Sequence, residues 1–438
     1  MKTKIYTTAI MLILSISVFA QNPNWSLYTT SNSPLTEDFV TSIQVDNHNK
    51  AWIGTYESGV VTFNGIEWVM MNSTNSTLSD NHIKFIEVDQ SNKKWIGTES
   101  DGIFTIEDDP DSGSPVVVGY GKLSDYISVT DKTNGDIDNL TCLAFDNYGN
   151  EWFGTWGGGL VSFDGTNWVA YSISNSGIPH NTIYSVAVSP VSNVVWVGTL
   201  NRGLASFDGF NWTVYDTTNS DLPGNTVYGV AIDAAGNIWS GTENGLAKFD
   251  GTSWEVYDVT GTTSALNYNI VHDLKIDNEG KKWLCTDKGI GVFNDTVWSF
   301  IKASNSPILV NNMSTVAFDS RGNNWIGTLG SGFAVNNPEG ITLNDDFLSF
   351  SGVRETIGMT VFPNPTRGGG TVTLEFGEIV DGKAEIFDAK GQSVKSLSTS
   401  DSNGSHSITF NTNDLVQGIY LVVFTDGKKI DTATLVIL

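Results

Sequence analysis

Seven copies of one short motif predict that this chain of 438 residues is an all-β protein built around a seven-bladed β-propeller. The motif is Trp-x-Gly-Thr, with Cys285 in place of the glycine in the sixth copy, and its tryptophans are Trp52, Trp95, Trp152, Trp196, Trp239, Trp283 and Trp325. They are separated by 43, 57, 44, 43, 44 and 42 residues. A nearly constant period of this length, made of short strand-like pieces, is typical of propellers, in which one repeat cannot bury its own faces. The 45 glycines and 14 tryptophans agree with many tight turns and large buried aromatic side chains.

One repeat divides into four short antiparallel strands of four residues or more. Apolar and polar residues alternate in its first segment, and Asn or Gly pairs separate the segments, as expected for hairpins with one buried face. The strands expected in the first repeat are 39–46, 50–56, 60–63 and 68–71. Four such strands make one propeller blade.

An aspartate follows the first strand of most repeats and opens a turn. The recurring positions are Asp46, Asp89, Asp146, Asp233, Asp277 and Asp319. So many aspartates suggest calcium loops, but the alternating carboxylates and late glutamate of an EF-hand are absent. We interpret each aspartate as a cap for its own turn.

The ends of the chain predict how the ring closes. The outer strand of a repeat carries Phe-Asp-Gly followed by Trp-x-x-Tyr, and the seventh repeat stops after Phe333 without that tryptophan. Trp25 and Tyr28 stand near the start of the chain with the same spacing and no blade before them. We therefore expect the N-terminal strand to complete the last blade and to cover its open edge.

The long interval between Trp95 and Trp152 contains an insertion of about 14 residues within 107–136, read from the excess over the usual period. A solvated surface loop is the favoured interpretation, and a binding loop or weak cation site is the alternative.

Composition shifts along the chain predict four segments. Residues 1–20 have two lysines, an apolar run and small residues before Gln21, which is the pattern of a secretory signal peptide. We expect the propeller over 21–338, a linker over 339–358 and a small Ig-like β-sandwich over 359–438, where short strands recur with regular turns. No segment of the mature protein is apolar and long enough to span a membrane.

Charge and cysteine content limit the partners and the redox chemistry. A net charge of −25 argues against nucleic acid and anionic membrane surfaces as partners. Cys142 and Cys285 fall in the third and sixth repeats, on nearly opposite sides of a seven-membered ring. Because a disulfide requires Cα atoms within about 7 Å, we predict two free, buried thiols.

Candidate binding residues are those at which the repeats disagree. An Asn or Asp stands near the start of each inner strand, at Asp38, Asn81, Asp138, Asn181, Asn225, Asn269 and Asn311. We interpret this shared position as turn capping. Three residues later the repeats differ, with Thr41, Lys84, Thr141, Tyr184, Tyr228, His272 and Ser314. Loops on the same face add Tyr56, Trp156 and Arg202.

We expect the ligand-binding residues at the channel mouth to be Lys84, Tyr184, Tyr228, His272, Tyr56, Trp156 and Arg202. Aromatic and polar groups around a funnel suit a glycan, and a protein ligand is also compatible with them. The competing interpretation is that these positions line a water-filled channel and have drifted because no ligand constrains them.

The sequence gives little support for catalysis, metal binding or a cofactor. The five histidines are scattered, and neither a His-x-x-x-His spacing nor Gly-x-Ser-x-Gly occurs. We therefore expect no metal, no cofactor and no assigned catalytic residue. A polysaccharide lyase or hydrolase using channel-mouth residues stays an alternative, as does a structural or adhesive surface protein with no small-molecule site.

Two resemblances add expectations about family and export. The repeat resembles the two-component regulator propeller repeats of sensor ectodomains in Bacteroidota, and the likeness rests on Trp-Ile-Gly-Thr, Phe-Asp-Gly, Trp-x-x-Tyr and Asn-Ser. The chain departs from that family in two respects. The membrane span and kinase of those sensors are absent, and Cys285 replaces a motif glycine. The segments 361–365, 387–392 and 415–420 resemble the type A sorting domain of the type IX secretion system (the Por system). This likeness implies that the secretion machinery and its sorting protease act on 359–438, and that the protein is released or attached to the outer-membrane surface.

Overall fold

The computed structural model contains two compact units, whose described residues fall within 24–343 and 359–437. It describes residues 24–108, 115–127, 136–258, 268–341, 343, 359–366, 368–380, 382–387, 393–398, 405–425 and 430–437. The expected signal peptide and most of the expected linker lie outside the described residues.

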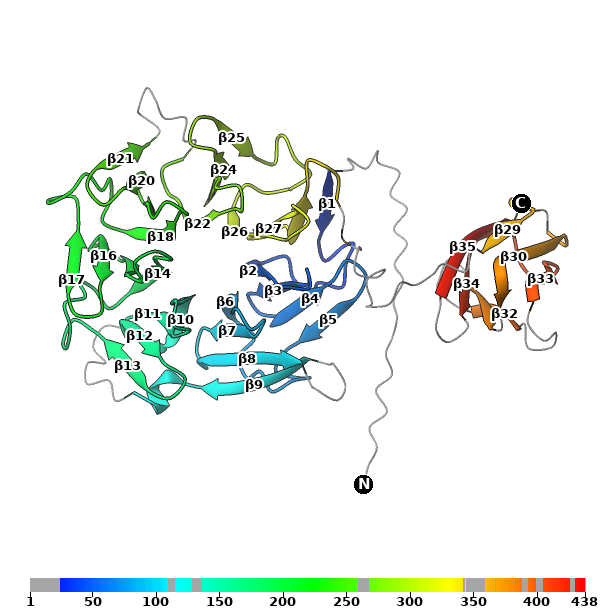
Figure 1. Ribbon diagram of the computed structural model, residues 1–438, viewed down its shortest axis with the longest axis horizontal. Coiled ribbons are helices and arrows are strands. Elements are labelled where there is room, and N and C mark those ends of the chain that lie inside the picture. The colour runs from blue at the N-terminus through cyan, green and yellow to red at the C-terminus, as the bar shows by residue number, and fades with distance from the viewer. Residues whose placement is uncertain are drawn as a thin grey trace. The chain divides into compact units, whose positions relative to one another are not determined.

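The first unit is a ring of seven four-stranded antiparallel sheets, so the predicted seven-bladed propeller is confirmed (Figure 1). Blade one contains β2 (Val40–Val45), β3 (Ala51–Thr55), β4 (Val60–Phe63) and β5 (Trp68–Met71). Blade two contains β6 (Ile83–Val88), β7 (Lys94–Thr98), β8 (Ile103–Asp108) and β9 (Pro115–Gly121). Blade three contains β10 (Asp136–Phe145), β11 (Glu151–Trp156), β12 (Leu160–Phe163) and β13 (Trp168–Tyr171). The short 3-10 helix η1 (Leu123–Asp125) connects blades two and three.

The remaining blades repeat the same order, with the first strand nearest the axis (Figure 1). Blade four contains β14 (Ile183–Val188), β15 (Val195–Thr199), β16 (Leu204–Phe207) and β17 (Trp212–Tyr215). Blade five contains β18 (Val227–Ile232), β19 (Ile238–Thr242), β20 (Gly245–Phe249) and β21 (Trp254–Tyr257). Blade six contains β22 (Asp273–Ile276), β23 (Lys282–Thr286), β24 (Gly289–Phe293) and β25 (Trp298–Ile301). Blade seven contains β26 (Met313–Phe318), β27 (Asn324–Thr328) and β28 (Phe333–Asn336).

The N-terminal strand closes the ring, as predicted. β1 (Trp25–Tyr28) pairs antiparallel with β28, with Trp25 opposite Asn336 and Tyr28 opposite Phe333. Tyr28 also contacts the first blade, because its ring lies 5.1 Å from that of Phe63 and 5.7 Å from that of Trp68. The clasp therefore completes blade seven through backbone pairing and contacts blade one through the Tyr28 side chain.

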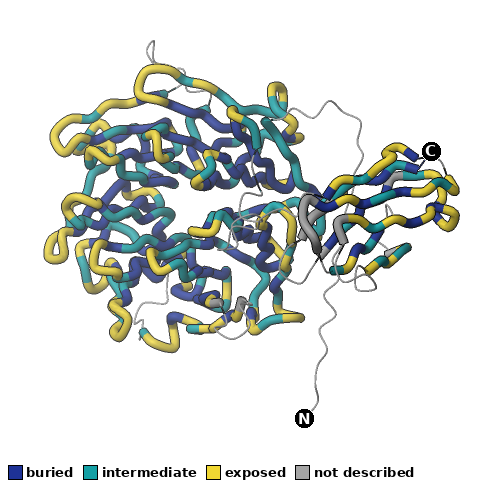
Figure 2. Tube along the Cα trace, turned by 45° about the vertical axis from the view of Figure 1, so that its right-hand side comes forward, coloured by how far each residue is buried: buried dark blue, intermediate teal, exposed yellow. Residues whose placement is uncertain are grey.

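The motif tryptophans are buried between neighbouring blades, where they act as scaffold. In blades three, four and five the motif Trp stacks on the Tyr of the outer strand, with centroids 5.8, 5.7 and 6.0 Å apart. A Phe from the next blade meets the same Trp edge-on, at 6.1, 6.1 and 6.2 Å. These large side chains supply much of the buried apolar surface between blades. The buried residues (dark blue in Figure 2) follow the strands, while the turns at their ends are exposed.

Each turn aspartate performs two functions. Asp46 Oδ1 accepts hydrogen bonds from the backbone N–H groups of His48 and Lys50, so the predicted turn cap is confirmed. Its other oxygen accepts the indole N–H of Trp52 at 2.9 Å. The same bond joins the Asp and Trp of blades two, three, five, six and seven, at 3.1, 3.3, 3.0, 2.9 and 3.0 Å. The aspartate thus satisfies the one polar atom of a buried tryptophan.

The motif glycine leaves room for the first strand of the following blade. A Cβ on Gly54 would lie 2.6 Å from Cγ2 of Ile83, and one on Gly241 would lie 2.7 Å from Cγ1 of Val271. In blade six Cys285 replaces this glycine, and the facing residue is Met313, which packs in the same buried cluster. An unbranched, flexible Met accommodates the larger neighbour where a β-branched side chain would clash.

The insertion in the second repeat is more structured than expected. The favoured interpretation of 107–136 as a surface loop is wrong in part, because Pro115–Gly121 forms β9, the outer strand of blade two. Tyr120 stacks on Trp95 at 5.4 Å and so takes the place of the motif Tyr. Residues 109–114 and 128–135 of this segment lie outside the described residues.

Both cysteines are free, as predicted, but only Cys285 is buried. Cys142 is half-buried on β10, because this strand faces the central cavity. Burial raises the pKa of the Cys142 thiol to about 11 and that of Cys285 well above its ordinary value.

The C-terminal unit consists of two antiparallel sheets, as the predicted β-sandwich requires. One sheet contains β29 (Thr360–Phe362), β30 (Thr371–Val380) and β33 (Ser405–Asn411). The other contains β31 (Lys383–Phe387), β32 (Ser393–Ser398), β34 (Gly418–Thr425) and β35 (Ile430–Ile437). Apolar side chains from both sheets, including Leu374, Phe376, Ile386 and Phe424, form one buried core.

Candidate functional site

The inner strands of all seven blades surround a central cavity of about 380 Å³. The divergent position of every repeat lies on its wall, at Thr41, Lys84, Thr141, Tyr184, Tyr228, His272 and Ser314. Five of these residues are the second residue of an inner strand, His272 directly precedes β22, and Thr141 lies within the longer strand β10. This end of the inner strands is the end of the ring that carries the blade-to-blade loops. We refer to this end as the channel mouth. The sequence therefore located the cavity wall, while a binding function for it stays a prediction.

Four aromatic rings from blades three to six form a continuous series along one side of the mouth, which we name the aromatic arc. Trp156 meets Tyr184 edge-on at 5.5 Å, Tyr184 lies 5.1 Å from Tyr228, and Tyr228 lies 5.9 Å from His272. None of the four is buried, and Trp156 is 42% exposed. Burial raises the pKa values of Tyr184 and Tyr228, so both phenols stay protonated at neutral pH.

The other predicted residues lie outside the arc. Tyr56 is 46% exposed and packs edge-on against His82, with centroids 3.8 Å apart. His82 pairs with Glu99, which also lies 3.8 Å from the Lys84 ammonium. Arg202 is exposed on the loop before β16 and does not line the cavity. The structure thus brings together four of the seven predicted residues, with Lys84 and Tyr56 in a second group and Arg202 separate.

An ion pair crosses the channel below the arc, and sequence reasoning missed it. Lys275 of blade six lies 3.3 Å from Glu87 of blade two, and Gln44 of blade one donates to the same carboxylate. The Glu87 carboxylate raises the pKa of Lys275 above its ordinary range, so the ammonium stays charged. These three residues occupy the position opposite the motif Trp, where the other four blades carry Ala144, Ala187, Ala231 and Ala317.

Charges at the mouth are paired with one another. His272 Nε2 lies 2.9 Å from Asp287 Oδ1, Lys84 lies near Glu99, and Lys275 pairs with Glu87. Asp287 was not predicted, and no sequence signal would have identified it, because it belongs to a short turn between β23 and β24. Among the described residues, no group of three or more His, Cys, Asp and Glu could hold a metal ion.

The shared Asn or Asp near each inner strand is structural, as interpreted. Asp38, Asn81, Asp138, Asn181, Asn225 and Asn311 each accept a backbone N–H of the loop that leads into the blade, at 2.7–2.9 Å. These residues fix the mouth loops, and this role satisfies the side-chain oxygens that a ligand would otherwise use.

Two family models match parts of the chain. Residues 360–438 match the secretion system C-terminal sorting domain, and residues 221–244, which include β18 and β19, match the two component regulator propeller. The C-terminal match identifies the β-sandwich as a sorting domain, so the protein is exported to the cell surface or secreted. No helix among the described residues is long and apolar enough to cross a membrane. No curated protein matches the sequence significantly.

Several solved structures share the fold at low sequence identity. The extracellular domain of the putative hybrid two component system BT3049 from B. thetaiotaomicron is 18% identical, with a TM-score of 0.59. The match covers 95% of this chain and 57% of that chain. PorZ, an essential surface component of the type-IX secretion system of Porphyromonas gingivalis, is 17% identical, with a TM-score of 0.52 and coverages of 93% and 61%. Virginiamycin B lyase from Staphylococcus aureus is 12% identical, with a TM-score of 0.53 and coverages of 71% and 98%. The chain thus spans about 60% of the length of the first two proteins.

Proposed function

We propose that this exported propeller binds a neutral glycan at the channel mouth. The observation that carries the proposal is the aromatic arc, in which Tyr184, Tyr228 and His272 line the central cavity and Trp156 extends the series by packing edge-on against Tyr184. Scaffold positions are alike from blade to blade, whereas these positions differ and stay accessible. The C–H faces of a pyranose ring pack favourably on aromatic rings, and a cavity of about 380 Å³ is within the range of small-ligand sites.

Polar groups near the arc would set the orientation of a bound sugar. The Tyr184 and Tyr228 phenols stay protonated and can both donate and accept hydrogen bonds. Below them Lys275 and Glu87 add a donor and an acceptor on the channel floor. Directed polar groups beside aromatic rings can fix the orientation of a small molecule.

The charge pattern favours a neutral ligand over an anionic one. The two lysines that line the cavity already face carboxylates, in the pairs Lys275–Glu87 and Lys84–Glu99. The net charge of −25 also repels polyanions at long range. We therefore propose a neutral hexose-containing glycan as the ligand class.

A glycan array probed with the full chain tests the proposal. We expect wild type to bind at least one neutral glycan, and a Tyr184→Ala/Tyr228→Ala variant to bind it at least about tenfold more weakly, as the loss of about 1.4 kcal/mol would give. Phe210→Ala is the matched control, because Phe210 is an aromatic residue that is 91% exposed and does not line the cavity. Equal binding by wild type and the double variant would refute the proposal, and so would binding to host proteins alone.

One observation favours a second candidate, a polysaccharide lyase or hydrolase. The His272 imidazole is held 2.9 Å from Asp287 beside the Tyr228 ring, and a His oriented by a carboxylate can act as a general base. Release of oligosaccharides from a neutral polysaccharide, lost in His272→Ala, would support this activity. A surface protein that only supports adhesion would give neither binding on the array nor product release.

A further inference from the structure

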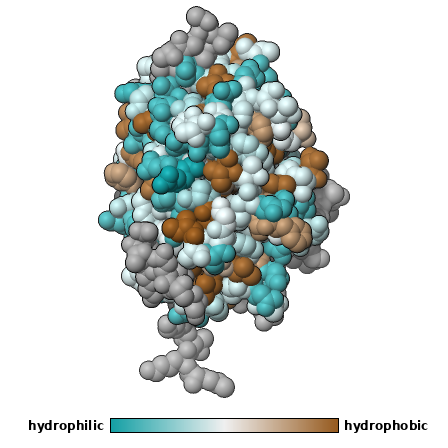
Figure 3. Space-filling view, turned by 90° about the vertical axis from the view of Figure 1, so that its left-hand side faces the viewer, coloured by the Kyte–Doolittle hydropathy of each residue, from teal (hydrophilic) through white to brown (hydrophobic). Residues whose placement is uncertain are grey.

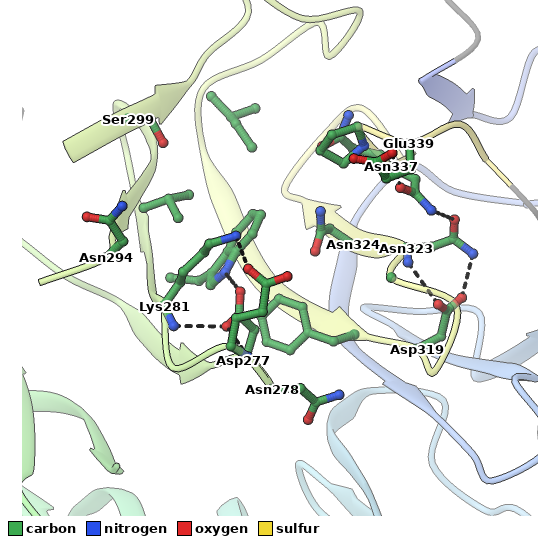
Figure 4. A pocket seen from close by; sticks show the side chains of 18 of the residues that line it. Asp277, Asn278, Lys281, Asn294, Ser299, Asp319, Asn323, Asn324, Asn337 and Glu339 are labelled. Atoms are coloured by element: carbon green, nitrogen blue, oxygen red, sulfur yellow. Dashed lines mark hydrogen bonds and ion pairs between the residues drawn. The ribbon is translucent and has the colours of Figure 1, made fainter. Parts of the chain in front are cut away.

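A second cavity, of about 800 Å³, lies between blades six and seven, at the end of the ring opposite the channel mouth. We name it the interblade groove. Its walls are formed by the Asp277 and Asp319 turns and by the outer part of blade six. Asn294 and Ser299 lie on one side of the opening, and Asn324 and Asn337 lie on the other (Figure 4).

The groove exists because two aromatic residues of the repeat are missing at this interface. In blades three, four and five a Tyr of the outer strand stacks on the motif Trp and meets a Phe of the next blade at 5.1 Å. In blade six Ile301 replaces that Tyr, and in blade seven Asn336 replaces that Phe. The Trp283 ring therefore contacts only Phe318 among the described aromatic residues, at 5.4 Å. The space that aromatic rings fill elsewhere stays open here.

The floor of the groove is apolar and its walls are polar. Trp283, Val292 and Phe318 contribute the floor. The side-chain amide of Asn324 and the hydroxyl of Ser299 have no hydrogen-bond partner in the part of the chain that the structure describes, and neither residue is buried. The Asn294 carboxamide accepts the backbone N–H of Val297 through its oxygen, which leaves its NH₂ group directed to the opening (Figure 4).

The charged residues of the groove are largely engaged within the protein. The Lys281 ammonium pairs with Glu279. Asp277 accepts the Trp283 indole N–H, and Asp319 accepts the Trp325 indole N–H at 3.0 Å. Arg321 and the exposed Glu339 also line the groove. The carboxylates of the lining disfavour an anionic ligand, and the uncharged amide and hydroxyl groups suit a polyhydroxylated neutral one.

We propose that the interblade groove is a second carbohydrate site, which takes a neutral oligosaccharide with a sugar ring over the apolar floor and hydroxyl groups on Asn324, Ser299 and Asn294. The site is separate from the channel mouth, so this inference goes beyond the proposed function and stands or falls without it. Two sites on one exported ring would increase the avidity of the protein for a polysaccharide by engaging two segments of it.

Fluorine NMR of the full chain labelled with 5-fluorotryptophan tests this site, with Trp283 assigned through Trp283→Phe. Maltotriose, cellotriose and mannotriose are the probes, each added to about 10 mM, a concentration that saturates a millimolar site. The experiment uses the Tyr184→Ala/Tyr228→Ala background, in which the mouth is impaired. We expect a saturable shift of the Trp283 resonance with at least one trisaccharide.

Two variants decide whether the shift reports the groove. Ile301→Tyr restores the residue that blades three to five carry, so it should fold normally and abolish the shift by filling the groove. Asn324→Ala should weaken binding about fivefold, as expected for one lost hydrogen bond. Thr213→Ala, the equivalent of Ser299 in blade four, is the control and should bind like the background. Absence of any shift with the three probes would overturn the proposal, and so would a shift that persists in Ile301→Tyr.

Discussion

Replacement of Glu151 by Gln should stabilise the propeller above neutral pH. Glu151 begins β11 and is only 8% exposed, and its Oε2 atom has no hydrogen-bond partner among the described residues. Burial raises the pKa of this carboxyl from 4.5 to about 7, and the charges of Asp89 and Asp146 act in the same direction. Because the folded pKa lies above the unfolded one, the unfolded chain releases its proton first as the pH rises.

The free energy of unfolding should therefore fall between pH 4.5 and about 7 and stay lower above that range. A difference of roughly 2.5 pKa units corresponds to about 3 kcal/mol, at 1.36 kcal/mol per unit. Glu151→Gln removes the titration, so its advantage over wild type should grow by about 2.5 kcal/mol between pH 5 and pH 8, since part of the change occurs below pH 5.

Urea denaturation of both proteins at the two pH values measures this difference. Glu67→Gln is the control, because Glu67 is exposed and lies in a hairpin turn of blade one. A difference between wild type and Glu151→Gln that is the same at both pH values would refute the reasoning.

Three further predictions follow from the closure of the ring, the thiols and the C-terminal unit. Deletion of residues 21–35 removes β1 with Tyr28, so the melting temperature should drop by several degrees, consistent with the loss of up to about 4 kcal/mol from one partly buried aromatic side chain; an unchanged melting temperature would contradict the clasp. Electrophoresis with and without reductant should give one mobility, and Cys285 should react with a thiol reagent only after unfolding; a band shifted by reductant would show a disulfide. Removal of residues 359–438 should trap the protein in the periplasm, and normal surface delivery of that variant would be inconsistent with a sorting role.

The scaffold could be predicted because its physical requirements recur in every blade. A buried tryptophan needs an apolar slot, and the approach of the next strand needs a small residue such as Gly54, so these choices repeat and fix the blade count. The closure by Trp25 and Tyr28 was readable because those residues complete an otherwise missing pattern. The spacing of six residues from Asp46 to Trp52 was also visible, but only the structure shows that it joins a carboxylate to an indole N–H.

The candidate sites were predictable only where a single position diverged. Tyr184, Tyr228 and His272 were found because they occupy one register on the cavity wall. The ion pair of Lys275 and Glu87 occupies the position three residues further along each strand, and the same comparison of repeats would have revealed it. Contacts between unrelated positions, such as His272 with Asp287, depend on the conformation of a turn and could not be read from the repeat.

In the view toward blades four and five, apolar side chains lie among polar ones (Figure 3). Exposed apolar residues such as Val169 and Val256 belong to outer strands of different blades. Isolated residues of this kind are normal for a soluble surface and do not by themselves mark an interface.

A crystal structure of the protein with a neutral glycan that binds on the array tests the central claim most directly. The account predicts sugar density in the central cavity, with a ring packed on Tyr184 or Tyr228 and hydroxyl groups near Lys275 and Glu87. A central cavity without sugar density, in a crystal where the same glycan is bound elsewhere on the ring, would contradict it.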